Sequence, residues 1–182
     1  RSSDLIGVQS FNTEVRQMVG RLDTKETVLE RLSALKAYGQ CSVVIDLIYG
    51  LPGQTMEVWE QDLADLVSSG VDGADLYQLN VFDGSDLNKD IANGKVPAAA
   101  TTAMQGEMFE FGRKYLDERS YRRLSAAHWS ANNRERSLYN TLAKSGVSMF
   151  PFGSGAGGNV DGYGMMLHRA LKPYEDMVIR GE

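Results

Sequence analysis

Residues 41–55 of this chain, CSVVIDLIYGLPGQT, decide its fold. The run up to Tyr49 is mostly apolar and rich in β-branched residues, and it ends at a Gly-Leu-Pro-Gly turn, which predicts a strand buried on both faces. Asp46 interrupts this run and shares a face with Val44 and Ile48, because side chains alternate along a strand. A buried carboxylate is unfavourable unless it is paired or hydrogen-bonded. Asp46 is therefore either an internal ion pair or a ligand contact carried on the sheet, and we favour the ligand contact.

The composition describes an ordinary globular protein. The chain has 182 residues, a net charge of −5 and a pI near 5.1, which allows one large domain or one and a half small ones. Basic residues are interleaved with acidic ones, so we expect no nucleic-acid partner, and no apolar stretch approaches the ~20 residues of a membrane span. The single cysteine, Cys41, excludes a disulfide framework and fits a reducing, cytoplasmic compartment. Because the sequence begins at Arg1, we expect a fragment or a processed product.

The first half of the chain alternates between strand and helix patterns. In chain order the expected elements are a strand over 5–11, a helix closed by Gly39, a strand over 41–49, a helix from Thr55 to Gly70, and a strand over 75–82. Residues 23–26 have the form of a capping box, with Asp23 as the acceptor and Glu26 three positions later. This order is typical of parallel βαβ units with right-handed crossovers. The predicted fold class is α/β, with about three βα units around a parallel sheet.

The pattern changes after residue 83. A polar, Gly- and Ala-rich connection over 84–100 is our predicted boundary between a region 1–83 and a region 101–182. The elements expected in the second region are a helix over 101–119, a strand over 121–129, a short helix over 133–144 and a helical segment over 163–180 interrupted at Pro173. We therefore expect an α+β C-terminal region.

The glycine cluster at 153–158 invites comparison with a phosphate loop, but the sequence after it does not fit. A phosphate loop leads at once into a helix, whose backbone N–H groups and dipole meet the phosphate. Here Asn-Val-Asp-Gly follows instead. We interpret the cluster as backbone that closely approaches either another segment or a large flat ligand.

Two residue sets are candidates for ligand chemistry. His128 and His168 are the only histidines, and either could be an axial ligand to haem iron, although a structural or surface histidine is the commoner case. Gln9, Arg21 and Asp46 form the better set, since they offer an amide, a guanidinium and a carboxylate. Such a set suits a ligand with a carboxylate, an amine and ribose hydroxyls.

Several motifs resemble the radical S-adenosylmethionine (SAM) enzymes, in particular the oxygen-independent coproporphyrinogen III oxidase superfamily. These motifs are residues 7–12, Arg21, residues 45–55, residues 77–85 and the glycine motif at 152–157. His128-Trp129, residues 134–140 and residues 152–158 are similar to the haem-utilisation subgroup, which opens the haem macrocycle anaerobically and transfers a methyl group to it. The resemblance implies that 1–83 is the second half of a partial TIM-like barrel and that 101–182 is a tetrapyrrole-enzyme region.

The same resemblance implies site residues and cofactors. Gln9 and Arg21 would hold the methionyl part of SAM and Asp46 its ribose, while the backbone at Val81 and Phe82 would face its adenine. The candidates for contact with haem or another substrate are His128, Trp129, Gly153, Gly155 and Gly157. The implied cofactors are SAM and a [4Fe–4S] cluster. The implied partners are a tetrapyrrole, haem or coproporphyrinogen III, and an electron donor such as flavodoxin.

One departure from the family concerns the cluster. The family's Cys-x-x-x-Cys-x-x-Cys motif is absent, and Cys41 alone cannot supply three thiolates. We therefore expect the C-terminal half of a longer enzyme, with no metal ligand in these residues and no activity by itself. Half a barrel also leaves one sheet edge unpaired, so we expect self-association or another cover for that edge.

Three functions stay open for the full-length parent. The first is anaerobic haem ring opening with methyl transfer, which Gly158-Asn159 favours, since the coproporphyrinogen enzymes usually continue the glycine motif into an Ala-His-Ser-like end. The second is oxidative decarboxylation of coproporphyrinogen III, whose propionates would suit several basic residues. Arginines that could serve it are Arg122, Arg123, Arg134 and Arg136. The third is a non-catalytic haem-binding or haem-trafficking protein.

Overall fold

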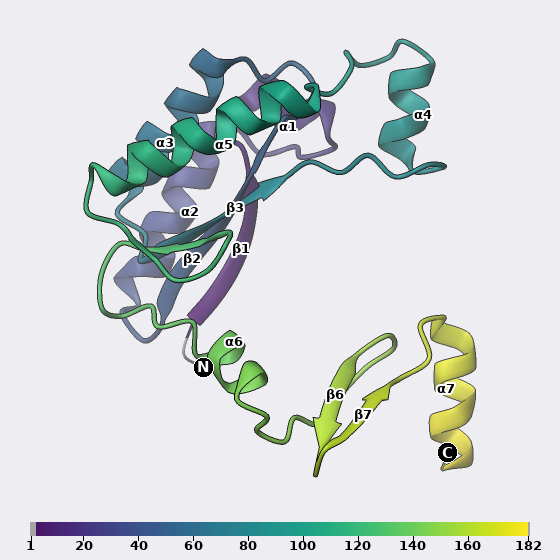
Figure 1. The fold of residues 1–182 in the computed structure, drawn as a ribbon. Helices are drawn as coiled ribbons and strands as arrows, with labels where there is room; N and C mark the ends of the chain where they lie inside the picture. Colours follow the sequence, from purple (N-terminus) through teal and green to yellow (C-terminus); the bar gives the residue numbers. More distant parts are fainter. Residues whose placement is uncertain (1–2, 182) are drawn as a thin grey trace. The chain divides into compact units, whose positions relative to one another are not determined.

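The computed structural model describes residues 3–181 and divides into two compact units after Arg136 (Figure 1). We call the part up to Arg136 unit 1 and the part from Ser137 onward unit 2, and we describe each by itself. The division lies far beyond the predicted connection at 84–100, because the segment after that connection packs with the first three strands. The predicted tetrapyrrole-enzyme role of 101–182 stays a prediction.

Unit 1 is built on a five-stranded sheet with the order β1-β2-β3-β5-β4. Its parallel strands are β1 (Ser3–Gln9), β2 (Ser42–Tyr49) and β3 (Gly73–Gln78), and the antiparallel ones are β5 (His128–Ser130) and β4 (Arg122–Arg123). The predicted parallel sheet is therefore confirmed. The predicted strand over 121–129 is wrong in part, because a turn divides it into β4 and β5. The predicted strand over 75–82 starts earlier and ends at Gln78.

Helices α2, α3 and α5 lie on one face of the sheet (Figure 1). The helices of unit 1 are α1 (Thr13–Met18), α2 (Lys25–Ala37), α3 (Met56–Ser69), α4 (Asp86–Ala92) and α5 (Thr102–Asp117). The core lies between the helices and the sheet, and Trp59, Leu63 and Met108 are fully buried there. At Gly112 of α5 an added methyl group would lie 3.2 Å from Leu76 and from Trp59, so this glycine allows α5 to pack closely.

Helix ends follow the cap residues of the sequence in most places. Thr55 accepts a hydrogen bond from Val58 N and begins α3, and the helix ends at Gly70, both as predicted. Gly70 has a left-handed conformation. The predicted capping box is wrong by one residue, since Thr24, and not Asp23, accepts from Thr27 N at the start of α2. The predicted connection over 84–100 contains α4.

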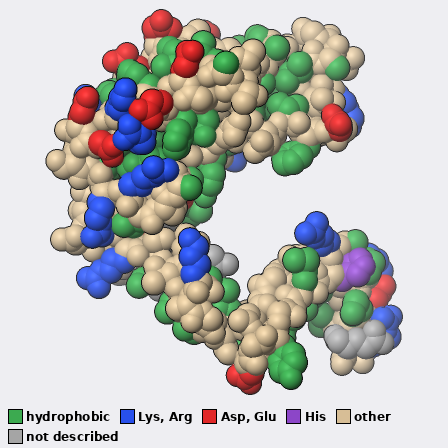
Figure 2. Space-filling model, in the orientation of Figure 1, with side chains coloured by type: hydrophobic (Ala, Val, Ile, Leu, Met, Phe, Trp, Pro, Cys, Tyr) green, Lys and Arg blue, Asp and Glu red, His purple; other side chains and the backbone are tan. Residues whose placement is uncertain are grey.

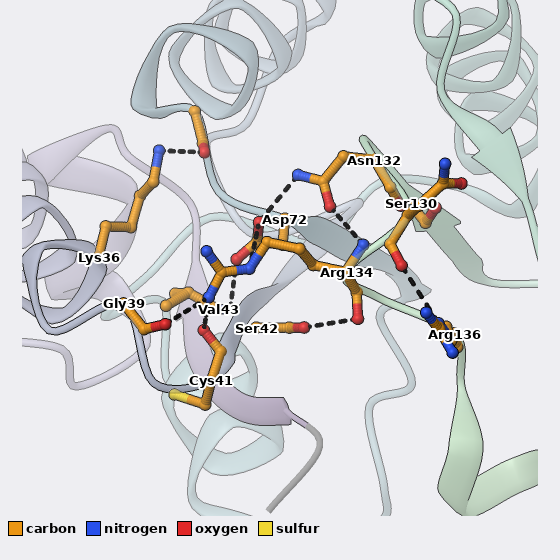
Figure 3. A network of polar contacts seen from close by, with 12 residues as sticks. Lys36, Gly39, Cys41, Ser42, Val43, Asp72, Ser130, Asn132, Arg134 and Arg136 are labelled. Atoms are coloured by element: carbon orange, nitrogen blue, oxygen red, sulfur yellow. Dashed lines mark hydrogen bonds and ion pairs between the residues drawn. The ribbon is translucent and has the colours of Figure 1, made fainter.

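Asp72 organises the amino-terminal end of the parallel strands (Figure 3). Its carboxylate accepts hydrogen bonds from Val43 N and from Asn132 Nδ2, each at 2.8 Å. Arg134 adds an ion pair at 3.7 Å and donates to the carbonyl oxygens of Gly39 and Cys41. Because these bonds join the starts of β2 and β3 to the segment after β5, they explain why that segment belongs to unit 1.

Unit 2 differs from its predicted structure. Its elements are α6 (Leu138–Lys144), the antiparallel hairpin of β6 (Gly157–Val160) and β7 (Tyr163–Met166), and α7 (Leu171–Arg180). The helix predicted over 133–144 begins only at Leu138. The helical segment predicted over 163–180 is wrong in its first part, which is β7, and Pro173 lies in the first turn of α7, where its missing N–H breaks no bond.

The surfaces of the two units differ in character. Acidic and basic side chains are intermingled on the face of unit 1 that is drawn, as the sequence predicted (Figure 2). Unit 2 exposes several large apolar side chains, among them Phe150, Phe152, Tyr163 and Ile179. No helix within residues 3–181 is long and apolar enough to cross a membrane.

Candidate functional site

Asp46 lies on the face of the sheet opposite to the helices. The alternate positions of β2, from Val43 to Tyr49, are buried in the helix-covered core. The pairing register places Asp46 beside Gly7 of β1 and Asp75 of β3, and Asp75 beside His128 of β5. Residues paired in this way share a face. We call Gly7, Asp46, Asp75 and His128 the cross-strand row.

Gln9 ends β1 in an unusual conformation. Its φ of 72° is in the left-handed region, and the pairing of β1 with β2 shifts register between Gly7 and Gln9. The buried guanidinium of Arg16 donates hydrogen bonds to the carbonyl oxygens of Val8 and Ser10, on both sides of Gln9. Arg16 therefore stabilises a backbone conformation that a non-glycine residue rarely adopts.

Gln9, Arg21 and Asp46 converge on Gly7. A methyl group added at Gly7 would lie 2.7 Å from Gln9 Nε2 and 3.4 Å from Arg21 Nη2. Gly7 is also the register partner of Asp46. The structure thus brings together the three residues that the sequence singled out, and it shows that the absence of a side chain at Gly7 leaves space for two of them.

Two buried oxygen atoms at this place lack partners. Gln9 Oε1 and Asp46 Oδ1 accept no hydrogen bond from any residue in the described part of the chain. This observation argues against the interpretation of Asp46 as a member of an internal ion pair. Burial, and next the charge of Asp75, raise the pKa of Asp46 to about 6, while His128 acts in the opposite direction. Buried acceptors without donors are typical of a site that a ligand completes.

Asp62 supports the loops around this site, and the sequence did not single it out. It lies in α3, is 1% exposed, and accepts hydrogen bonds from Ser10 Oγ, Phe11 N and Gln54 Nε2 at 2.7–3.0 Å. Gln54 in turn accepts from Gly50 N at 2.8 Å. One carboxylate therefore fixes the loops that follow β1 and β2. The sequence could have indicated this role, because Asp62 is an acidic residue on the apolar face of a predicted helix, next to Leu63.

His128 and Trp129 are buried in β5, 6% and 0% exposed. His128 Nδ1 lies 2.9 Å from Asp75 Oδ1, and Nε2 lies 3.5 Å from Glu135 Oε1. An axial haem ligand needs a ring nitrogen that faces the iron, and here both nitrogens face carboxylates. This geometry disfavours the predicted axial role. The sequence missed Asp75 and Glu135, although Asp75 interrupts an apolar strand as Asp46 does.

The remaining predicted residues lie elsewhere. Val81 and Phe82 are in the segment that follows β3, at its carboxyl end, and Phe82 is 72% exposed. His168 is exposed and accepts a hydrogen bond from Ala170 N at 3.1 Å, in the loop before α7 rather than in a helix.

The glycine cluster belongs to unit 2. Gly153 and Gly155 have positive φ, and Gly157 begins β6. A methyl group at the neighbouring Gly158 would lie 2.4 Å from the carbonyl oxygen of Met149. At Gly158 the close approach is therefore to another segment, one of the two alternatives that the sequence left open.

Comparison with known proteins identifies the barrel segment. Residues 5–66 match the Radical SAM superfamily. The chain is 37% identical over 177 residues to anaerobilin synthase from Escherichia coli O157:H7, which covers 97% of this chain and 40% of the relative. Through these two matches the chain is similar to the radical SAM superfamily.

Further relatives agree with this assignment. Heme chaperone HemW from Lactococcus lactis is 28% identical over 86% of the chain and 41% of the relative. In structure the chain is similar to coproporphyrinogen III oxidase (HemN) from Escherichia coli, with a TM-score of 0.79 at 20% identity, over all of this chain and 44% of that one. The chain spans about 40% of the length of these relatives.

The radical SAM family implies SAM and a [4Fe–4S] cluster, and the site fits the first of these. SAM carries an amine and ribose hydroxyls that can donate to Gln9 Oε1 and Asp46 Oδ1, and a carboxylate that Arg21 can bind. The cluster does not fit these residues. The sequence holds one cysteine, and within residues 3–181 no group of three or more His, Cys, Asp and Glu side chains could hold a metal ion.

Proposed function

We propose that these 182 residues form the SAM-binding half of a radical SAM tetrapyrrole enzyme that opens haem anaerobically and transfers a methyl group. The observation that carries the cofactor assignment is the pair of buried, unpartnered acceptors, Gln9 Oε1 and Asp46 Oδ1, beside Arg21. The similarity to anaerobilin synthase over 97% of the chain supports the substrate class.

In this proposal each residue has a defined task. Gln9 accepts from the amine of SAM, Arg21 binds its carboxylate, and Asp46 accepts from the ribose hydroxyls. Arg16 and Asp62 hold the loops in place, so that SAM meets preorganised groups. The segment at Val81 and Phe82 faces the adenine. SAM bound to a reduced cluster supplies the radical chemistry, and these side chains orient it.

The cluster ligands in this proposal come from sequence outside these 182 residues. An electron donor such as flavodoxin reduces the cluster, and the chain by itself is inactive. β1 has one neighbour among the described strands, which leaves an edge to which further barrel strands can add. In their absence, self-association through this edge is expected.

In unit 2 the glycine motif supports contact with a tetrapyrrole. Phe152 is 87% exposed and precedes Gly153, where the absence of a side chain leaves the backbone open. In this proposal the exposed ring of Phe152 and the backbone at Gly153, Gly155 and Gly157 contact the porphyrin face.

A second candidate function is haem trafficking without catalysis, which the similarity to heme chaperone HemW supports. The third, oxidation of coproporphyrinogen III, draws on a similarity of fold and on weaker sequence matches.

The experiment uses the full-length protein with its cluster reconstituted under anaerobic conditions. Haem and coproporphyrinogen III are offered separately with SAM and a reductant, and product masses are followed. An open-chain, methylated tetrapyrrole formed from haem is the expected result. Loss of two carboxyl groups from coproporphyrinogen III would instead assign the biosynthetic reaction. Stoichiometric binding of intact haem, without turnover, would assign the trafficking role.

A further inference from the structure

The cross-strand row joins the proposed SAM site to a buried group that this site does not use. Asp46 is the member proposed to contact SAM, and Asp75 and His128 follow it on the next two strands of the sheet. Glu135, 3% exposed, closes the row on the far side of the imidazole. Three carboxyl groups and one imidazole therefore lie in series within unit 1.

The geometry favours a doubly protonated imidazole. Nδ1 lies 2.9 Å from Asp75 Oδ1 and Nε2 lies 3.5 Å from Glu135 Oε1, and an N–H on each nitrogen suits both neighbours. Burial by itself lowers the pKa of His128, but the hydrogen bond and charge of Asp75, followed by the charge of Glu135, raise it above its ordinary value. The positive charge of the imidazolium then offsets the charge of Asp75.

The charge of Asp46 depends on these neighbours. Asp75 of β3 repels a second negative charge on Asp46, whereas His128 of β5 attracts it. Tyr77 lies two positions after Asp75 on β3, on the same face, and burial and both aspartates raise its pKa. From β1 the row meets the uncharged Gly7, with the amide of Gln9 and the guanidinium of Arg21 beside it.

We propose that His128 is a positioning residue that, through Asp75, sets the charge that Asp46 presents to SAM and thereby the pH range in which SAM binds. This inference rests on the proposed role of Asp46 in SAM binding. It gives His128 a task that needs no contact with haem, in agreement with its burial.

Two substitutions should move SAM binding in opposite directions. A carboxylate accepts from ribose hydroxyls better than a carboxylic acid, so SAM affinity should rise as the pH rises through about 6 and level off above that pH. His128→Gln removes a favourable charge, which shifts this rise to higher pH and weakens SAM binding at pH 6 by about threefold to tenfold. Asp75→Asn removes the repelling charge and shifts the rise to lower pH. Purely structural roles would weaken binding at every pH without these opposite shifts.

The test is calorimetric titration of SAM into the cluster-reconstituted full-length protein between about pH 5 and 8. The carboxyl carbon of Asp46 is titrated by NMR in the same proteins without SAM, with its signal assigned from Asp46→Asn. Opposite shifts in His128→Gln and Asp75→Asn confirm the proposal, and shifts in one direction, or none, overturn it. Glu135→Gln keeps the histidine and should shift the titration of Asp46 to higher pH by a smaller amount. This variant replaces His128→Gln in the test if His128→Gln does not fold.

The two measurements also separate this inference from the proposed function. If the wild-type protein fails to bind SAM, the proposed function fails, and the NMR titration still decides whether His128 controls Asp46. If SAM binds and the NMR midpoint of Asp46 is the same in His128→Gln as in the wild type, the inference alone is overturned.

Discussion

Asp72 and Asp46 are two carboxylates on the same parallel sheet, and they differ in what surrounds them. Asp72, at the amino-terminal end, accepts from Val43 N and Asn132 Nδ2 and pairs with Arg134. Asp46, further along β2, has a buried Oδ1 that accepts no hydrogen bond from any group in residues 3–181. The contacts of Asp72 join strands of the sheet, whereas Asp46 Oδ1 has no hydrogen-bond donor among the described residues. The number of hydrogen-bond partners, rather than burial, thus distinguishes the carboxylate that joins strands from the one that we propose to contact SAM.

The largest expected effect is on the stability of unit 1 when Asp72 is removed. Asp72→Ala leaves Val43 N and Asn132 Nδ2 without their acceptor and should lower the free energy of unfolding by about 3 kcal/mol. Urea denaturation at neutral pH measures this loss. Asp86→Ala is the matched control, since that side chain is fully exposed, and its change should stay within about 0.5 kcal/mol. Equal effects of the two substitutions would remove the special role of Asp72.

Asp46→Asn should raise the free energy of unfolding at neutral pH, whereas Asp72→Ala lowers it. Folding raises the pKa of Asp46 from 3.8 to about 6, so the protonated acid favours the folded state below pH 4, and this contribution is lost as pH rises through about 6. The amide introduced by Asp46→Asn does not ionise and so avoids this loss. Above pH 6 this variant should therefore be more stable than the wild type, by on the order of 1 kcal/mol after allowance for solvent screening. Urea denaturation at pH 4 and at pH 7.5 compares the two proteins. A destabilised variant at pH 7.5 would mean that Asp46 is a structural residue.

Gly7→Ala sharpens the comparison at the ligand end. The added methyl group would lie 2.7 Å from Gln9 Nε2, the mobile end of a side chain, so Gln9 should move with little change in stability. SAM affinity should fall by about tenfold, the equivalent of one lost hydrogen bond. Gly106→Ala in α5 is the control, because no atom lies within 4 Å of its added methyl group. If SAM binds equally well to both variants, Gln9 does not contact it.

The smallest expected effect concerns haem. His128 is buried between two carboxylates, so His128→Gln should leave the Soret band and the haem affinity of the full-length protein unchanged. Haem titration followed by absorbance checks this expectation. Loss of the Soret shift in the variant would restore His128 as an axial ligand.

Much of unit 1 was predictable because its signals are local. Thr55 as a cap, Gly39 as a left-handed helix end and the apolar run around Asp46 each act within a few residues, and each prediction is confirmed. The convergence of Gln9, Arg21 and Asp46 was implied by family resemblance. Its geometric cause, the missing side chain at Gly7, needed the register of β1 against β2.

The predictions that failed depend on contacts between distant segments. The boundary was placed at 84–100 because composition changes there, whereas the packing of α5 on Leu76 and the bonds of Asp72 to Asn132 keep the later segment in unit 1. β7 was mistaken for helix because its hairpin partner is a glycine-rich strand with a weak strand pattern. Asp75 was not predicted as a site residue, because its partner His128 is 53 residues away in the sequence.

Calorimetric titration of SAM into the reconstituted full-length protein, as wild type and as Asp46→Asn, tests the central claim most directly. The account predicts that Asp46→Asn weakens SAM binding by at least about tenfold at pH 7.5, because an amide replaces a charged acceptor. Asp72→Asn, measured at a temperature where it remains folded, should bind SAM as the wild type does. Unchanged SAM affinity in Asp46→Asn would contradict the account.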